Sequence, residues 1–323
     1  MIKLFLGNKT IVLLLLPLYL VMYQCLNYFY PFYQLDVMSN FGFWTEYIYL
    51  DSASSIICAS LFVLMNSFGL NALVNRNKFL ERNTYFIALL YIVMMSLFHS
   101  AYYLNGVLIS QFLLILMIHQ FFKLNRPEDG RKTIFNSFFF AGFAATFTPV
   151  LMLSAPLLIL PMLIMRPFKL REMIVAVLGY ATPFIYILSF AYLFNISIDF
   201  GLADHQLIQS ENKDFLFVAA TMCILLILGT ISVVTKSQKT TINSNKQFRI
   251  LLILVLIFVI SALYYILSFQ QIDHLSLILI PISIFLIFSF LSNTYGIAAT
   301  VLFYVVFGYS VIKFFLFLPN QNL

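Results

Sequence analysis

Three places in the chain combine side chains suited to chemistry with a position between apolar segments. Asp36 lies in the first of these places, Asp204 and His205 are adjacent in the second, and Asp273 and His274 repeat the pairing in the third. A carboxylate within hydrogen-bond reach of a hydroxyl group can take up its proton. Carboxylate and imidazole groups also bind divalent metal ions, so the one cofactor that these residue types suggest is a divalent metal ion.

Each of these residues also has an interpretation without chemistry. Asp36 is placed to cap a helix or to remain a solvated charge, and an Asp–His neighbour pair occurs in ordinary loops. What distinguishes the five residues is that the charge pattern of the chain predicts all of them on one side of a membrane. We therefore take Asp36, Asp204 and His205 as candidate catalytic residues, and Asp273, His274 and Trp44 as candidate substrate contacts.

The composition is that of an integral membrane protein. Of the 323 residues, 62% are hydrophobic and 9% are charged, whereas a soluble domain carries about 25% charged residues. The mean hydropathy is +0.98, and apolar runs of about 20 residues, long enough to cross a bilayer as a helix, recur along the chain. We expect an all-α fold, a polytopic transmembrane helical bundle, with residues 1–323 as a single integral membrane domain in a lipid bilayer.

The basic residues predict the orientation of this bundle. They form short clusters between apolar runs, as residues that set membrane topology do. In the alternating topology, 16 of the 18 Lys and Arg residues fall on the inside and the exceptions are Lys213 and Lys313, while eight of the 12 acids fall on the outside. The N-terminus is then cytoplasmic, and the membrane is the bacterial inner membrane. The net charge of +6 is explained as a topology signal, so no nucleic-acid partner is expected.

This pattern predicts about 11 spans, within a range of about 10 to 12, since each needs about 20 residues. Two of the 11 come from residues 133–165. The others are expected at residues 11–26, 53–74, 83–103, 107–122, 172–195, 215–235, 250–269, 275–291 and 297–317.

Residues 133–165 are too short for two full spans and a loop, yet basic clusters flank both of their ends. Pro149, Pro156 and Pro161 interrupt the stretch, and proline breaks helical hydrogen bonding. Two short helices that meet near Thr146 to Pro149 fit this pattern, and so does a re-entrant hairpin. Irregular backbone at membrane depth persists only where protein or a water-filled cavity covers it.

Two outer segments are expected, at residues 27–52 and 196–214. The first holds the only Trp, Trp44, and has no Lys or Arg. Its apolar residues recur at helical spacing, which predicts a helix lying in the plane of the membrane surface. Those residues are Val37, Phe41, Trp44 and Ile48.

Polar groups inside the predicted spans are few. His99 and His119 lie within or near the third and fourth spans. A histidine in a span indicates function unless it makes an ordinary interhelical hydrogen bond. No acid is predicted deep inside a span, which argues against a pump that relies on an intramembrane carboxylate.

Three stretches of sequence resemble a family of uncharacterised polytopic inner-membrane proteins of Bacteroidota, and the likeness covers most of the chain. They are LVNRNKFLERNTYFIALLY (residues 73–91), the pair Arg171-Glu172 and the motif GYATP (residues 179–183). This resemblance implies a multi-pass inner-membrane protein and carries no catalytic motif.

The architecture is also similar to GT-C-type membrane glycosyltransferases. Those enzymes use polyprenyl-phosphate sugars and place an acidic residue in the first outer loop, which Asp36 would match. The chain departs from them in its short first outer segment, the lack of an adjacent acidic pair and the lack of a soluble C-terminal domain. The resemblance implies a GT-C-like arrangement, with a polyprenyl-phosphate-linked sugar as substrate.

Three functions follow as hypotheses. The first is a glycosyltransferase, or an accessory of one, acting at the outer face. The second is a non-enzymatic component of an envelope assembly, such as secretion or gliding machinery, with other membrane proteins as partners. The third is a small-molecule transporter in which the broken helices of residues 133–165 hold the substrate.

Overall fold

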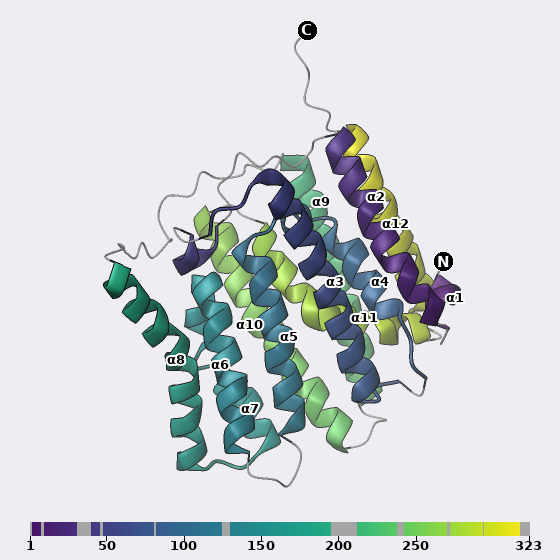
Figure 1. The fold of residues 1–323 in the computed structure, drawn as a ribbon. Helices are drawn as coiled ribbons and strands as arrows, with labels where there is room; N and C mark the ends of the chain where they lie inside the picture. The colour runs from purple at the N-terminus through teal and green to yellow at the C-terminus, as the bar shows by residue number, and fades with distance from the viewer. Residues whose placement is uncertain are drawn as a thin grey trace.

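The computed structural model describes residues 2–7, 10–30, 40–45, 48–80, 82–124, 130–194, 212–237, 242–269, 272–292 and 294–316. Within these ranges the chain forms α-helices and short 3-10 helices and contains no strand. Most of the helices stand side by side and form an upright bundle (Figure 1). The predicted all-α helical bundle is confirmed.

Among the described residues, eight helical segments are long and apolar enough to cross a membrane. The chain is therefore a multi-pass membrane protein, and the full number of crossings stays a prediction. The segments are Val12–Phe29, Ser52–Arg76, Gly106–Lys123, Leu170–Phe194, Asp214–Ser237, Ser244–Ser268, Asp273–Leu291 and Gly296–Leu316.

These segments correspond to six long helices and two composite segments. The long helices are α3 (Ser52–Arg76), α5 (Gly106–Lys123), α8 (Leu170–Phe194), α9 (Asn212–Ser237), α10 (Ile242–Phe269) and α12 (Gly296–Leu316). One composite segment joins the end of the 3-10 helix η1 (Thr10–Leu14) to α2 (Leu15–Phe29), and the other joins the 3-10 helix η5 (Asp273–Ile278) to α11 (Leu279–Leu291). Near the N-terminus, α1 (Ile2–Phe5) precedes η1.

The centre of the bundle is made by two short helices rather than by the long ones. Every residue of α4 (Phe86–Met95) is buried, and so is every residue of α11 from Leu279 to Ser289. A helix that is apolar on all sides is stable only when protein or lipid surrounds it entirely. By contrast, α8 exposes large apolar side chains such as Ile174 and Leu188 along its length, as a helix facing lipid does.

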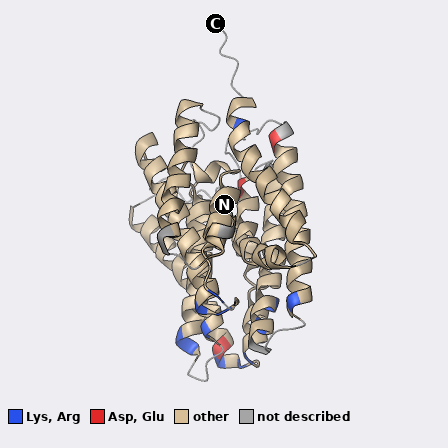
Figure 2. Ribbon diagram, turned by 90° about the vertical axis from the view of Figure 1, so that its right-hand side faces the viewer, with Lys and Arg blue, Asp and Glu red and all other residues tan. Residues whose placement is uncertain are grey.

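Basic residues gather at one end of the bundle, the lower end in Figure 2. They lie at the C-terminal ends of α3, α5 and α9 and at the N-terminal ends of α6 (Arg131–Phe147), α8 and α10. This is the arrangement that the predicted topology requires, because Lys and Arg mark the cytoplasmic side. We call this the basic end, and the opposite end the outer end.

Residues 133–165 fold as a helix, a turn and a second helix. Helix α6 ends at Phe147, the 3-10 helix η4 (Pro149–Ser154) follows, and α7 (Ile159–Met165) completes the stretch. Pro149 stands at the start of η4, where its missing N–H group is not needed. The helical break lies near Thr146 to Pro149, while the number of times this stretch crosses a membrane stays a prediction.

Helices α6 and α8 pack with their backbones in contact. A Cβ atom added at Gly179 would lie 2.7 Å from the carbonyl oxygen of Phe135, and one added at Gly142 would meet the carbonyl oxygen of Tyr180. Such close approach of two helices requires residues without side chains, as at many helix contacts in membranes. This contact fixes α6 and thereby the position of its C-terminal end.

Candidate functional site

The candidate residues Asp36, Asp204 and His205 lie outside the described residues. The other three candidates, Trp44, Asp273 and His274, are described, and the structure places them in three different surroundings. Asp273 lies in a polar region beside the connection between α4 and α5, the ring of His274 stacks on Tyr265 of α10, and Trp44 packs against α6.

The polar region forms where the chain between α4 and α5 is not α-helical. Helix α4 ends at Met95, the 3-10 helix η3 (His99–Ala101) follows, and α5 begins at Gly106. The Asn105 side chain caps α5 by accepting a hydrogen bond of 3.0 Å from the N–H of Leu108. Because α3 and α5 both end at basic residues, their N-terminal ends place this region toward the outer end.

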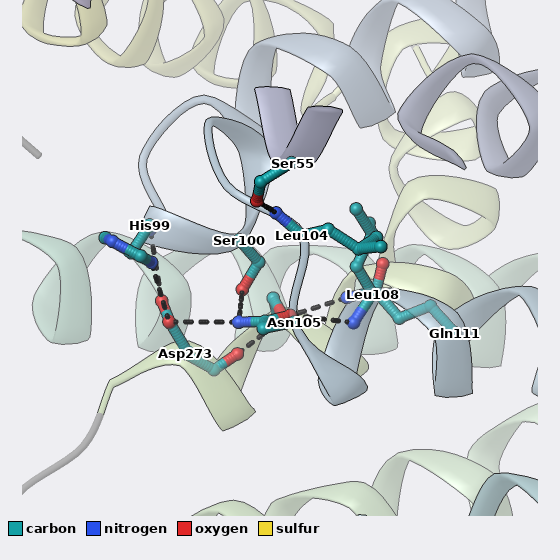
Figure 3. A network of polar contacts seen from close by, with 9 residues as sticks. Ser55, His99, Ser100, Leu104, Asn105, Leu108, Gln111 and Asp273 are labelled. Carbon is teal, nitrogen blue, oxygen red and sulfur yellow. Dashed lines mark hydrogen bonds and ion pairs between the residues drawn. The ribbon is translucent and has the colours of Figure 1, made fainter. Parts of the chain in front are cut away.

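Asp273 joins this connection from the other half of the chain. Its Oδ1 atom accepts a hydrogen bond of 3.1 Å from the main-chain N–H of His99, and its Oδ2 atom lies 3.9 Å from Nδ1 of the same residue. Asn105 donates through Nδ2 to Asp273 at 3.4 Å and to Ser100 at 2.9 Å (Figure 3). We call His99, Ser100, Asn105 and Asp273 the outer polar centre.

A chain of hydrogen bonds leads from the outer polar centre into the apolar core. The Ser276 hydroxyl donates to the carbonyl oxygen of Asp273 at 2.5 Å and accepts from Nε2 of Gln111 at 2.8 Å. Oε1 of Gln111 accepts from the Tyr91 hydroxyl, which accepts in turn from Nδ2 of Asn66 at 3.1 Å. These side chains are buried, and their hydrogen bonds fix the relative positions of α3, α4, α5 and η5. At the inner end of the network, Oδ1 of Asn66 has no hydrogen-bond partner among the described residues.

Lys313 on α12 is a fully buried basic residue beside this region. Its Nζ atom donates a hydrogen bond of 2.6 Å to the carbonyl oxygen of Ser96 and lies 5.4 Å from the centre of the Tyr102 ring. The charges of Asp214 and Asp273 are close enough to act on it. An ionisable group inside a membrane span is a candidate for function, and sequence reasoning missed this one.

Two further contacts connect the terminal helices to the same region. The Tyr309 hydroxyl donates to Oδ1 of Asp214, which is buried, at 2.6 Å. The hydroxyl groups of Tyr23 on α2 and Ser310 on α12 lie 2.8 Å apart. Burial raises the pKa of the Tyr102 phenol well above its usual range, and the nearby Tyr23 and Asp214 add to this effect, so Tyr102 remains a neutral hydrogen-bond donor.

The structure corrects one expectation about Asp273 and His274. They were expected in a short turn between two spans, but both begin a helical segment, and His274 is buried with its ring stacked on Tyr265. The reason is that η5 extends the apolar helix α11 back to Asp273, so the polar residues are drawn into the bundle. No acid was expected deep inside a span, and among the described residues Asp214 and Asp273 are each the first residue of a candidate span.

His99 and His119 have different surroundings. His99 belongs to the outer polar centre, whereas Nε2 of His119 lies 3.5 Å from Nη1 of Arg76. Since Arg76 is at the C-terminal end of α3, His119 lies near the basic end. Of the two histidines, only His99 therefore lies near Asp273, the described acid candidate.

Trp44 belongs to the predicted surface helix, of which the structure describes residues 40–45 and 48, and the helix from Val37 to Ile48 stays a prediction. Residues 42–44 form a single 3-10 turn, η2, and Gly42 has a φ of +62°, a left-handed conformation that ends a regular helix. Phe41 is buried. The Trp44 indole donates to Oγ1 of Thr146 at 3.1 Å and stacks on Phe147 at 5.8 Å between ring centres.

The turn at residues 40–45 is bound to the N-terminal end of α5. The N–H of Gly106 donates a hydrogen bond of 2.8 Å to the carbonyl oxygen of Asn40. Gly42 and Gly106 both face the end of α6, where a Cβ atom on Gly42 would lie 2.6 Å from the carbonyl oxygen of Thr146. The first outer segment is therefore attached next to Asn105, a member of the outer polar centre.

The described residues contain no group of three or more His, Cys, Asp or Glu side chains that could hold a metal ion. A divalent metal ion as cofactor thus stays a prediction that involves Asp36, Asp204 and His205. Within the described part, the outer polar centre offers a carboxylate, an imidazole, an amide and a hydroxyl, which suits hydrogen bonding and proton transfer.

Comparisons with protein families, with characterised protein sequences and with solved structures give no match to this chain. The residues and the fold themselves establish its class, a multi-pass helical membrane protein with a polar centre toward the outer end.

Proposed function

We propose that the protein is a GT-C-like glycosyltransferase, or an accessory of one, that acts at the outer face of the bacterial inner membrane on a polyprenyl-phosphate-linked sugar. In the transfer, an acceptor hydroxyl bonds to the anomeric carbon of the sugar, the bond to the polyprenyl phosphate breaks, and a base takes the hydroxyl proton. Asp36 is the proposed base, and Asp204 and His205 are proposed to hold the phosphate.

The observation that carries the proposal is the attachment of the first outer segment beside the outer polar centre. Asn40 is bound to Gly106, the residue after Asn105. Asp36 precedes Asn40 by four residues, and four residues extend at most about 14 Å. The polar side chains of the centre are thus within reach of a substrate that contacts Asp36.

One observation favours a transporter as the second candidate. Helix α4 stops after ten residues, and η3 and η5 replace α-helix where the buried polar network lies. Interrupted helices around polar groups form the substrate sites of many transporters. The transporter site would then lie at the outer polar centre rather than at residues 133–165.

The enzyme hypothesis is tested in a strain from which the native copy of the protein has been deleted. This strain is complemented with either the wild-type protein or Asp36→Asn, expressed at equal level. Asp36→Asn is expected to abolish sugar attachment to an envelope acceptor and to cause the polyprenyl-linked sugar to accumulate, both measured by mass spectrometry. The matched control is Asp51→Asn, an exposed acid at the start of α3, which is expected to leave both unchanged.

The possible results separate the candidates. Unchanged glycans with Asp36→Asn, together with loss of glycans when the chain is absent, would replace the enzyme by an accessory or a scaffold. Glycans that are unchanged both with Asp36→Asn and in the absence of the protein would exclude any role in sugar transfer. In that case, uptake of solutes by the purified chain in liposomes, with and without Asp273→Asn, tests the transporter.

A further inference from the structure

We infer that His99 and Asp273 form a proton-exchange site toward the outer end of the bundle, where one proton passes between the imidazole ring and outer water or a substrate hydroxyl. Nothing in the proposed transfer assigns this role, because Asp36 is the base there. The inference goes beyond that function and holds whether or not the chain transfers sugar.

The geometry holds the imidazole ring against the carboxylate. The main-chain N–H of His99 is hydrogen-bonded to Oδ1 of Asp273 at 3.1 Å, which fixes the backbone that carries the ring. Nδ1 then lies 3.9 Å from Oδ2, an ion-pair distance once the ring is protonated. The ring also stacks on Tyr103 at 5.3 Å between centres. An acid that orients an imidazole in this way stabilises its protonated form.

The pair has an edge open to its surroundings, unlike the network behind it. The side chains of His99 and Asp273 are 10% and 18% exposed, whereas Ser100 and Gln111 are fully buried. Figure 3 shows His99 at the margin of the group, with Asn105 and Gln111 on the far side of Asp273. A proton can therefore enter at the ring while the carboxylate stays anchored by Asn105.

Charged and titratable groups from several elements surround the pair. Lys313 on α12 is close enough to Asp214 on α9 and Asp273 on η5 for their charges to act on it. The ring of Tyr103 stacks on His99, and the phenols of Tyr23 and Tyr102 lie beside Asp214 and Lys313. A cation on the His99 ring would thus face carboxylates, and opposite charges stabilise one another in a protein interior.

The test uses the purified full-length chain in lipid nanodiscs, with ¹⁵N-labelled histidine and NMR detection. His99→Gln identifies the His99 signals, and the nitrogen shifts give the fraction of rings that carry the second proton. At pH 6, Asp273→Asn is expected to reduce the ratio of protonated to neutral His99 about tenfold, because the cation loses its adjacent anion. The control Asp51→Asn, at an exposed position, is expected to leave the ratio unchanged.

Two results would overturn the inference. One is an equal ratio in Asp273→Asn and in the wild type, which would mean that the carboxylate does not act on the ring. The other does not depend on Asp273→Asn and so remains decisive if that variant does not fold. It is a wild-type His99 signal that keeps one charge state from pH 5 to pH 8, which would mean that no proton is exchanged.

Discussion

The Nζ atom of Lys313 lies 2.6 Å from the carbonyl oxygen of Ser96, the residue that caps the C-terminal end of helix α4. The amino group thus sits at the negative end of a helix dipole and has no exposed surface. The Tyr102 hydroxyl donates to the same oxygen at 2.9 Å. These two donors connect the last helix of the bundle to the connection that carries His99.

Replacing Lys313 by methionine is therefore expected to destabilise the protein by about 3 kcal/mol. The apolar stem is retained, but Ser96 loses a donor and the buried acids Asp214 and Asp273 lose a counter-charge. Thermal unfolding of the purified chain in detergent measures the loss. Lys132→Met, at an exposed position at the start of α6, is the matched control and should have little effect. Equal unfolding temperatures for the two variants would contradict this role of Lys313.

The glycines at the joint between the first outer segment, α5 and α6 give a second prediction. Gly106→Ala is expected to destabilise by about 1–3 kcal/mol, since the added methyl group meets the carbonyl oxygen of Phe147 and the backbone must move. Gly308→Ala on α12 has no atom within 4 Å of the new methyl group and should be neutral or stabilising. Unfolding midpoints of both variants provide the measurement, and the prediction fails if Gly308→Ala is the more harmful change.

The class of fold and the end at which basic residues gather follow from the sequence because both depend on local properties. A run of apolar residues and a cluster of Lys and Arg are each visible within a short window. Around Trp44 the spacing of apolar residues is helical, but the described residues 42–44 form a 3-10 turn. The left-handed conformation of Gly42 and the contacts of residues 40–45 with α5 and α6 override local periodicity there.

The outer polar centre could not be predicted, for a different reason. His99 and Asp273 are 174 residues apart, and no local pattern reveals which helix ends meet. Two signals did point toward it. The pair Asn105-Gly106 is typical of a turn, which places a polar residue at the start of α5, and Lys313 is one of two exceptions to the charge rule. Lys313 is predicted on the outer side of the membrane, where Lys and Arg are rare, and the structure shows it buried against the carbonyl oxygen of Ser96.

The hydrogen bond between Trp44 and Thr146 gives a third prediction, suited to a double-mutant cycle. Trp44→Phe and Thr146→Val each remove one partner of the 3.1 Å contact. The interaction energy between the two changes is expected to be about 1 kcal/mol, the net value of a typical hydrogen bond. Unfolding of the two single variants and the double variant gives this energy. Strictly additive effects would mean that the indole N–H does not hold the outer segment on α6.

The buried chain from Asn66 to Asp273 gives the fourth prediction. Tyr91→Phe keeps the ring but removes the hydroxyl that donates to Gln111 and accepts from Asn66. Oε1 of Gln111 then lacks its donor in a fully buried place, and Nδ2 of Asn66 keeps only its bond of 3.3 Å to the carbonyl oxygen of Leu108. This change is expected to cost about 1–3 kcal/mol. Tyr186→Phe, on the exposed face of α8, removes a hydroxyl without such neighbours and should leave stability unchanged.

Because Gln111 also holds Ser276, which donates to the carbonyl of Asp273, Tyr91→Phe is further expected to speed amide hydrogen exchange at His99. Exchange at His99 that remains at the wild-type rate, despite lower overall stability, would show that the chain supports the core without positioning the outer polar centre.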